Sequence, residues 1–212
     1  MRLLIPALLF AALGAADLPA QIFPLQATVE LPTATGTDAD HATIAINAEG
    51  DIFVCWQTAR PDLSGMDSIK QVEGVFIPRQ DMQGWIMPTI NDVIVLGDPS
   101  LGVLGPSETC RKPDVVAVGN NFIVTWPRNV PGGGAGQIEV AHVQRLGGGS
   151  YSLDVPAAGR GYVVDANVLS GDAGMMPDLV ALSRDNDLAG VAYVHEVSNT
   201  GGPNAKREYD IR

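Results

Sequence analysis

Apolar residues recur along the chain in three short segments of one pattern, each with alanine at its fifth position between two branched apolar residues. The segments are HATIAI at 41–46, PDVVAV at 113–118 and PDLVAL at 177–182. A turn signal rich in Gly, Asn or Asp follows each segment, and then comes a second apolar run: DIFVCWQ at 51–57, NFIVTWP at 121–127 and DLAGVAYVH at 187–195. Gly and Asn supply the positive φ that tight hairpins require. The pattern therefore predicts three β-hairpins.

The first strand of each predicted hairpin is apolar at consecutive positions rather than at alternate ones. A strand with one face in water would alternate between apolar and polar residues. We therefore expect these strands to be covered on both faces. The recurrent alanines, Ala45, Ala117 and Ala181, indicate crowding, as on the innermost strand near an axis.

After each hairpin the chain becomes more polar but keeps the pattern of strands. In the first unit a third strand is predicted at 68–80, and a fourth begins at 84–88 and continues at 92–96. The second unit repeats this order with strands at 137–145 and 151–155. Four antiparallel strands in each unit, with the innermost strand buried, are typical of a β-propeller blade. The predicted fold is all-β, an array of such blades of which two are complete and one is partial.

The chain divides into five predicted segments. Residues 1–20 have the positive start, the apolar run and the small residues of a secretory signal peptide. Residues 21–40 form a leading strand and a linker, 41–112 the first blade, 113–176 the second blade and 177–212 a partial third blade. We expect a secreted, periplasmic or cell-surface protein, because no later stretch is long enough to span a membrane.

Closed propellers have four blades or more. The sequence therefore predicts that further C-terminal blades, or self-association, complete the fold. A fragment of a larger propeller, an open stack of sheets and closure by oligomerisation stay open as alternatives.

The segments also resemble a known family type, the bacterial extracellular repeats of sialidase-like (Asp-box) propellers, in which P-x-[VIL]-A is followed by a Gly-containing turn and [FIL]-V-V-x-W. The resemblance rests on Pro113, Ala117, Phe122, Val124 and Trp126, and in the first unit on Ala45, Gly50, Val54 and Trp56. The Asp-box itself is degraded, since Asp81, Gly84 and Trp85 lack its spacing.

The resemblance implies a propeller fold and two classes of function. The first is a non-catalytic exported module for binding or scaffolding at the envelope or outside the cell. The alternative is a fragment of a sialidase-like glycoside hydrolase, with catalytic residues partly outside this chain. Such an enzyme needs an arginine cluster, a Tyr–Glu pair and an acidic proton donor, a set that we cannot place in this sequence.

In a blade, the loops before the first strand and after the second strand share one rim. That rim gathers candidate ligand-binding residues: Asp40, His41, Arg60, Arg111, Arg128, His195 and Glu196. Arg111 and Arg128 are placed to clamp a carboxylate. The competing interpretation is a solvated rim of ordinary charged loop residues. For Trp56 and Trp126 we expect burial between blades, with a platform that stacks on a carbohydrate as the alternative.

The formal net charge of -11 argues against nucleic acid as a partner, because phosphate contacts need a basic surface. A glycan or a protein is the expected ligand. No cofactor is predicted, although the closely spaced oxygen donors at 37–41 and 184–190 are of the kind that bind calcium, or that cap their own turns. No metal-ligand spacing links the three histidines. The two cysteines, Cys55 and Cys110, either form one disulfide bond in an oxidising compartment or remain small buried side chains.

Overall fold

The computed structural model describes residues 39–61, 68–80, 84–85, 88–101, 108–129, 135–169, 177–183, 188–199 and 207–211. All of them belong to one compact unit, Pro32–Arg212. The predicted signal peptide and most of the leading segment lie outside the described residues. The described part is all-β: every strand pair is antiparallel, and its helical residues form only short 3₁₀ turns. The all-β, antiparallel prediction is therefore confirmed.

The first sheet is a meander of four antiparallel strands in the order β1-β2-β3-β6. Its strands are β1 (Ala39–Ile46), β2 (Ile52–Pro61), β3 (Ser68–Ile77) and β6 (Ile94–Gly97). The hairpin β1–β2 turns at Gly50, whose φ of +85° is the positive value predicted for that turn. Of the predicted fourth strand, the part at 92–96 overlaps β6, which takes the fourth position, whereas the part at 84–88 was wrong because β5 (Gly84–Trp85) pairs with β4 (Arg79–Gln80).

The second sheet has the same four positions, but both of its edges are split between two strands. Its central strands are β9 (Asn121–Asn129) and β10 (Ala135–Arg145). Two strands pair with the edge of β9 that faces away from β10, namely β7 (Thr109–Cys110) and β8 (Asp114–Val118). Two more share the far edge of β10, namely β11 (Tyr151–Asp154) and β12 (Tyr162–Leu169). We did not predict β12, which follows a Gly-containing turn.

The third unit consists of two separate hairpins in the described residues. β13 (Asp178–Ser183) pairs with β14 (Leu188–Ala192), and β15 (Val194–Asn199) pairs with β16 (Arg207–Ile211). The single second strand predicted at 187–195 is therefore interrupted at Tyr193. The Tyr193 hydroxyl donates to Asp165 Oδ2 of β12 at 2.8 Å, which ties this interruption to the second sheet.

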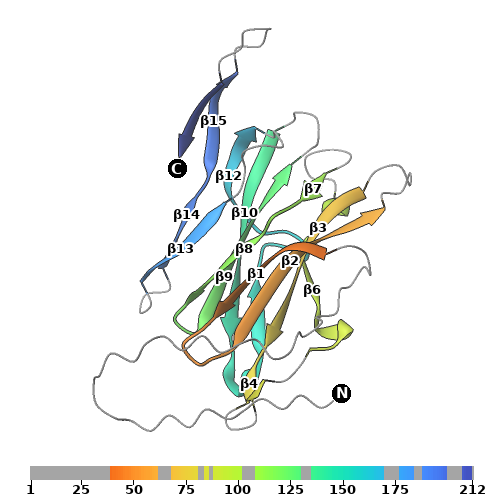
Figure 1. Ribbon diagram of the computed structural model, residues 1–212, viewed down its shortest axis with the longest axis vertical. Helices are drawn as coiled ribbons and strands as arrows, with labels where there is room; N and C mark the ends of the chain where they lie inside the picture. Colours follow the sequence, from red (N-terminus) through yellow and green to blue (C-terminus); the bar gives the residue numbers. More distant parts are fainter. Residues whose placement is uncertain are drawn as a thin grey trace, which may run out of the picture. The chain divides into compact units, whose positions relative to one another are not determined.

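The first strands of the three units lie in a row in the order β1, β8, β13, each contacting the next (Figure 1). Asp114, at the start of β8, joins both neighbours. One carboxylate oxygen accepts a hydrogen bond from the Thr43 hydroxyl of β1 at 3.1 Å, and the other accepts from the Leu179 backbone N–H of β13 at 2.7 Å. β8 is thus the middle strand of the row.

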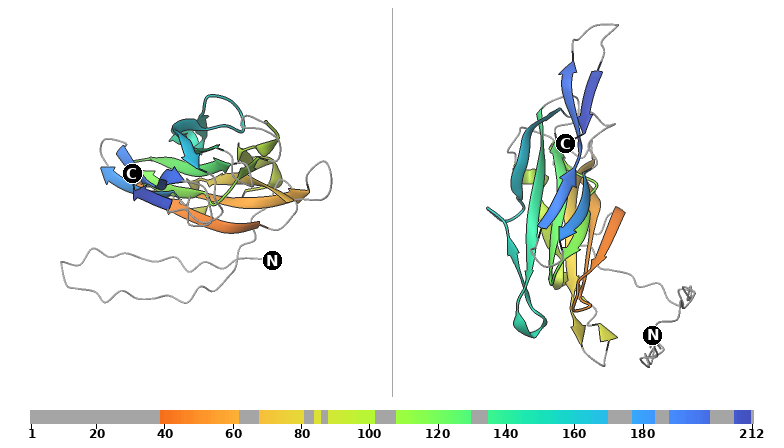
Figure 2. Two further views of the ribbon diagram at one scale, coloured as in Figure 1. Left: turned by 90° about the horizontal axis from the view of Figure 1, so that it is seen from above. Right: turned by 90° about the vertical axis from the view of Figure 1, so that its left-hand side faces the viewer.

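The two larger sheets pack face to face and enclose the main apolar core. Phe53 and Phe76 of the first sheet contact Phe122 of the second, with ring centroids 5.7 and 6.2 Å apart. In Figure 2 the strands of the first sheet, coloured orange to yellow, lie on one side and the teal strands of the second sheet lie on the other. A second contact joins the hairpin turns, where Asn47 Nδ2 donates to the Asn120 carbonyl oxygen at 2.8 Å.

Two interactions occur at equivalent places in both sheets and explain the recurrent tryptophan. The indole N–H of Trp56 donates to Glu73 at 3.1 Å, and that of Trp126 donates to Glu139 at 2.9 Å. In each sheet the tryptophan lies directly opposite its glutamate on the neighbouring strand. Both indoles are buried, so the expectation of burial is confirmed and the exposed carbohydrate platform is wrong.

In both sheets, a side-chain oxygen at the start of the second strand also accepts a hydrogen bond from a backbone N–H at the end of the third strand or just after it. Asp51 Oδ1 accepts from the Arg79 backbone N–H at 2.7 Å, and Asn121 Oδ1 accepts from the Arg145 backbone N–H at 3.0 Å. The two sheets are therefore repeats in their side-chain contacts as well as in their strand order.

The first strands are not all covered on both faces, contrary to prediction. In β8, Val118 is fully buried and Val116 is half-buried. The equivalent residues of β1, Ile44 and Ile46, are 60% and 58% exposed, and those of β13, Val180 and Leu182, are 54% and 60% exposed. The reason is the number of neighbours: β8 lies between two first strands, whereas β1 and β13 each contact one.

Candidate functional site

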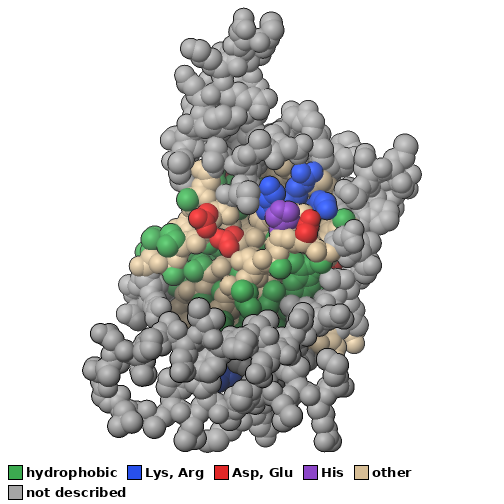
Figure 3. All heavy atoms as spheres, in the orientation of Figure 1, with side chains coloured by type: hydrophobic (Ala, Val, Ile, Leu, Met, Phe, Trp, Pro, Cys, Tyr) green, Lys and Arg blue, Asp and Glu red, His purple; other side chains and the backbone are tan. Residues whose placement is uncertain are grey.

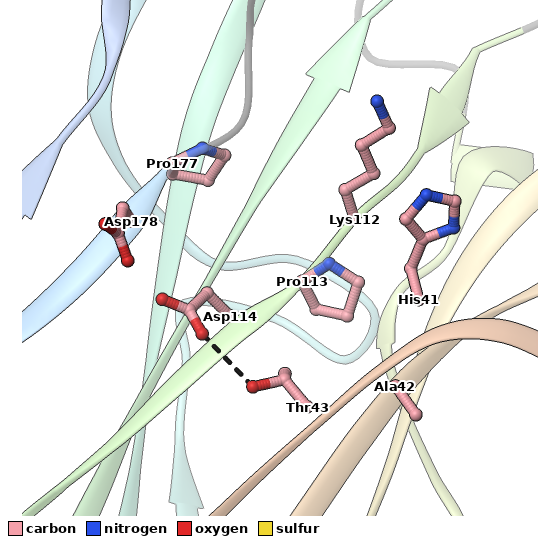
Figure 4. Close-up of a pocket in the computed structure, with 8 residues that line it drawn as sticks. All are labelled: His41, Ala42, Thr43, Lys112, Pro113, Asp114, Pro177 and Asp178. Carbon is pink, nitrogen blue, oxygen red and sulfur yellow. Dashed lines mark hydrogen bonds between the residues drawn. The ribbon is translucent and has the colours of Figure 1, made fainter.

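A cavity of about 480 Å³ lies where the three first strands begin. Each unit contributes to its wall, as Figure 4 shows: His41, Ala42, Thr43, Lys112, Pro113, Asp114, Pro177 and Asp178. The repeated Pro-Asp pair accounts for half of this lining, because it occurs at the start of both β8 and β13. The cavity is therefore built from corresponding positions of three repeats.

Two residues of the cavity wall have a backbone conformation that residues other than glycine rarely adopt. His41 has φ of 51° and Lys112 has φ of 42°, and they are the only non-glycine residues with positive φ in the described part of the chain. His41 lies in a register irregularity of β1 between Asp40 and Thr43. The Lys112 backbone N–H donates to the buried Gln57 side chain at 2.9 Å. Positive φ at a residue with a side chain tends to cluster at functional sites.

The charged side chains divide the cavity into an acidic side and a basic side. Asp114 and Asp178 lie together on one side of the view in Figure 4, and Lys112 and His41 lie together on the other. His41 Nδ1 is 3.3 Å from Asp40 Oδ1, and both side chains are partly exposed. Figure 3 shows the same face with basic side chains beside a histidine and acidic side chains to both sides of them. The arrangement offers both acceptors and donors to a polar ligand.

The two carboxylates of the cavity differ in the hydrogen bonds that they accept and in their exposure. Asp114 accepts from Thr43 and Leu179, as described above, and also from the Val115 backbone N–H at 2.9 Å. Its main role is therefore structural, since it joins three strands. Asp178, by contrast, is exposed at the start of β13. Of the two, Asp178 is the better placed to contact a ligand.

The predicted rim residues are only partly brought together. His41 lines the cavity, and Asp40 lies beside it with a carboxylate oxygen 3.3 Å from His41 Nδ1. Arg111 is half-buried between β7 and β8, where its backbone N–H donates to the Pro127 carbonyl oxygen at 3.2 Å. Three more of the predicted residues have their backbone in strands, but their side chains lie outside the described part: Arg60 in β2, and His195 and Glu196 in β15.

Arg128 was wrongly predicted as a rim residue, because its guanidinium is fully buried inside the second sheet. It donates to Glu139 Oε1 and to Glu108 Oε2, each at 2.9 Å. It also donates to the carbonyl oxygens of Asp98 and Gly159, each at 2.9 Å. Such a network neutralises a buried cation and satisfies its donors. Arg111 and Arg128 therefore do not form the predicted carboxylate clamp.

Three buried acids in or beside the two sheets were missed in the sequence. Glu73, Glu108 and Glu139 are all fully or almost fully buried. A usable signal exists for two of them, since the third strands share Gln-apolar-Glu: QVE at 71–73 and QIE at 137–139. Together with the tryptophan on the preceding strand, this triplet marks the recurrent indole–carboxylate pair.

Cys55 and Cys110 are both buried and both have free thiols in the structure. Burial raises the pKa of the Cys55 thiol well above its ordinary value, and the nearby Asp114 carboxylate raises it further. Burial also raises the pKa of the Cys110 thiol, against the opposing effect of Arg128. Neither thiol is therefore a reactive nucleophile in the folded protein.

The candidate calcium segments are only partly placed, because residues 37–38 and 184–187 lie outside the described part. Among the residues that are described, no three His, Cys, Asp or Glu side chains are grouped so that they could hold a metal ion. No helix of the described residues has the length and apolar character needed to cross a membrane.

No family model, curated protein or solved structure matches this chain. Its function is therefore inferred from its own residues.

Proposed function

We propose that this protein is an exported, non-catalytic module of propeller type that binds a polar ligand in the cavity at the start of its first strands. The two larger sheets each have four strand positions, and three first strands lie in one row. These observations favour blades arranged around a common axis, the organisation typical of a propeller.

The single observation that carries this proposal is the composition of the cavity wall. Three repeats contribute corresponding residues to one cavity, and two of those residues, His41 and Lys112, have an unfavourable backbone conformation. A purely structural loop gains nothing from such strain, whereas a site that must present specific side chains does.

The ligand class follows from the side chains. Asp178 accepts hydrogen bonds from hydroxyl groups, while Lys112 and His41 face the same cavity and suit a carboxylate or another anionic substituent. A hydroxyl-rich ligand with one negative group meets both sides of the cavity. We therefore propose a glycan that contains an acidic sugar, in preference to a protein ligand.

The alternative function, a sialidase-like glycoside hydrolase, has less support from the described residues. That chemistry relies on several arginines around the substrate carboxylate, and no arginine is among the cavity-lining residues in the part of the chain that the structure describes. Asp114, the more enclosed of the two carboxylates, is engaged by three donors. Binding without hydrolysis is the function that this geometry supports best.

The proposal is tested by screening immobilised glycans and measuring the affinity of those retained by isothermal titration calorimetry. We expect binding of acidic glycans, weakened at least tenfold by Lys112→Ala and by Asp178→Ala. Asp154→Asn, on the exposed face of β11, is the matched control and should bind like the parent protein. Loss of binding in the control, unchanged binding in both cavity variants, or release of free sugar during incubation would each contradict the proposal.

A further inference from the structure

The exposed apolar strips on β1 and β13 are the strongest feature of the molecule that the proposed ligand site leaves unexplained. Ile44 and Ile46 form the strip on β1, and Val180 and Leu182 form the strip on β13. The alternate residues are less exposed: Ala45 of β1 packs against the main core, and Leu179 and Ala181 of β13 are half-buried. Two pairs of large apolar side chains, each more than half exposed on an outermost strand of the row, indicate surfaces that another element covers.

The middle strand shows what covers such a strip. Val116 and Val118 occupy the equivalent positions on β8, and they are half-buried and fully buried because β1 and β13 flank β8 on its two sides. A first strand placed beside β13 would cover Val180 and Leu182 as β13 covers β8. A first strand placed beside β1 would likewise cover Ile44 and Ile46.

The start of β13 offers a polar contact of the same kind. Asp114 of β8 accepts from the backbone N–H of Leu179, the second residue of β13, at 2.7 Å. Asp178 holds the equivalent position on β13 and is exposed. Thr43 is the residue of β1 that corresponds to Leu179. Its backbone N–H is therefore the donor that the repeat assigns to one carboxylate oxygen of Asp178, which leaves the other oxygen for a ligand in the cavity.

We infer that the protein associates head to tail, with β1 of a second copy packing against β13 in the way that β13 packs against β8. The contact between β13 and β1 of the second copy would repeat the packing of neighbouring first strands that the chain already contains twice. The strips on β13 and on β1 are both apolar. The described residues hold three first strands, so two copies of this chain give six, a number within the four to eight blades of known propellers. Two equivalent β13–β1 junctions would then close a ring. The inference rests on the proposed propeller-type organisation but not on the ligand.

The experiment measures molar mass by light scattering coupled to size-exclusion chromatography, with protein expressed from the full sequence and without any glycan. We expect a dimer for the parent protein and monomers for Ile44→Glu and for Val180→Glu. Val164→Glu is the matched control, because Val164 is also exposed but lies on β12, away from the row. It should remain a dimer. Far-UV circular dichroism checks that each variant is folded, and Ile46→Lys and Leu182→Lys replace any variant that is not.

Mixing the two monomeric variants separates this arrangement from others. The Ile44→Glu chain keeps an intact β13 strip, and the Val180→Glu chain keeps an intact β1 strip, so the mixture should form a dimer although neither variant does so alone. A monomeric parent protein would overturn the inference. So would a dimer that survives one of the two substitutions, since that result indicates pairing of like strips. Glycan binding is measured separately, so its failure would leave this result unaffected.

Discussion

The first and second sheets have the same frame but differ in what surrounds the buried glutamate. In both, an indole N–H donates to a carboxylate that lies directly opposite on the neighbouring strand. The donors to Glu73 include the neutral side chains of Thr58 and Gln71. Glu139 instead meets Arg128, which occupies the position equivalent to Thr58. The repeat therefore fixes the position of the carboxylate, while the residue two places after the tryptophan decides whether a hydroxyl or a guanidinium donates to it from that position.

The network around Arg128 and Glu139 also joins parts of the chain that are distant in sequence. Arg128 connects the carbonyl oxygens of Asp98 and Gly159, and the Asp98 backbone N–H itself donates to the Gly159 carbonyl oxygen at 2.9 Å. The second sheet thereby holds the segment that leaves β6 and the turn before β12. Substitutions at equivalent positions of the two sheets should consequently differ in their effect.

The largest difference is expected between Glu139→Gln and Glu73→Gln. The groups around Glu139 all donate hydrogen bonds to it, so the amide nitrogen of a glutamine would face other donors. Arg128 would also lose a counter-charge, and breaking a buried ion pair costs about 3–5 kcal/mol. At Glu73, the Gln71 side chain can turn its oxygen, which is buried without a hydrogen-bond partner, towards the new amide. We expect a cost there of at most about 1 kcal/mol. Urea unfolding of both variants measures the difference, and equal destabilisation would show that Arg128 does not distinguish the sheets.

A smaller effect is expected at the contact between the two sheets. A Cβ added at Gly97 of β6 would lie 2.8 Å from Trp126 Nε1 and 2.9 Å from Cys110 Cβ. Gly97→Ala should therefore overpack this contact and destabilise the protein by about 1–3 kcal/mol. Gly147→Ala is the matched control, since nothing lies within 4 Å of its added Cβ. Thermal unfolding compares them, and an unchanged melting temperature for Gly97→Ala would mean that the sheets can move apart without loss.

The link between the second and third units should be weaker than the contact between the two sheets. Asp114→Ala removes the acceptor of the Leu179 backbone N–H and of the Thr43 hydroxyl. We expect a loss of about 1–2 kcal/mol. Hydrogen exchange should show faster exchange of the Leu179 amide while the Trp126 indole N–H stays protected. Equal acceleration at both positions would indicate that the units unfold together and that Asp114 is no local link.

The smallest expected effect is that of Thr43→Val, which removes one donor to Asp114 and keeps the shape of the side chain. The Asp114 carboxylate retains two backbone donors, so the loss should be about 0.5–1 kcal/mol. Urea unfolding measures it, and Thr89→Val, an exposed threonine that donates to Asp92, serves as the control outside the row. A loss larger than that of Asp114→Ala would contradict the assigned order.

The hairpins and the register of the first two units could be predicted because turn chemistry and apolar patterning are local properties. Gly50 and the runs that end at Trp56 and Trp126 are sufficient for that. The burial of Arg128 and Glu139 could not be predicted from their types, since charged residues are mostly exposed and only their mutual contact makes burial favourable. The exposure of Ile44 and Val180 depends on how many neighbours each first strand has, which no local pattern encodes. Of the predicted rim residues, His41 is one that lines the cavity, because the loops at one rim of a blade converge.

The two enclosed sulfhydryl groups have a consequence for any copy of the protein that meets an oxidant. A folded copy presents no thiolate to an oxidant, because Cys55 and Cys110 are both buried and their thiols resist ionisation. A copy that opens exposes both at once and becomes open to oxidation and to wrong cross-links with other chains. Any oxidising surroundings would thus mark damaged copies covalently and leave intact ones unmarked.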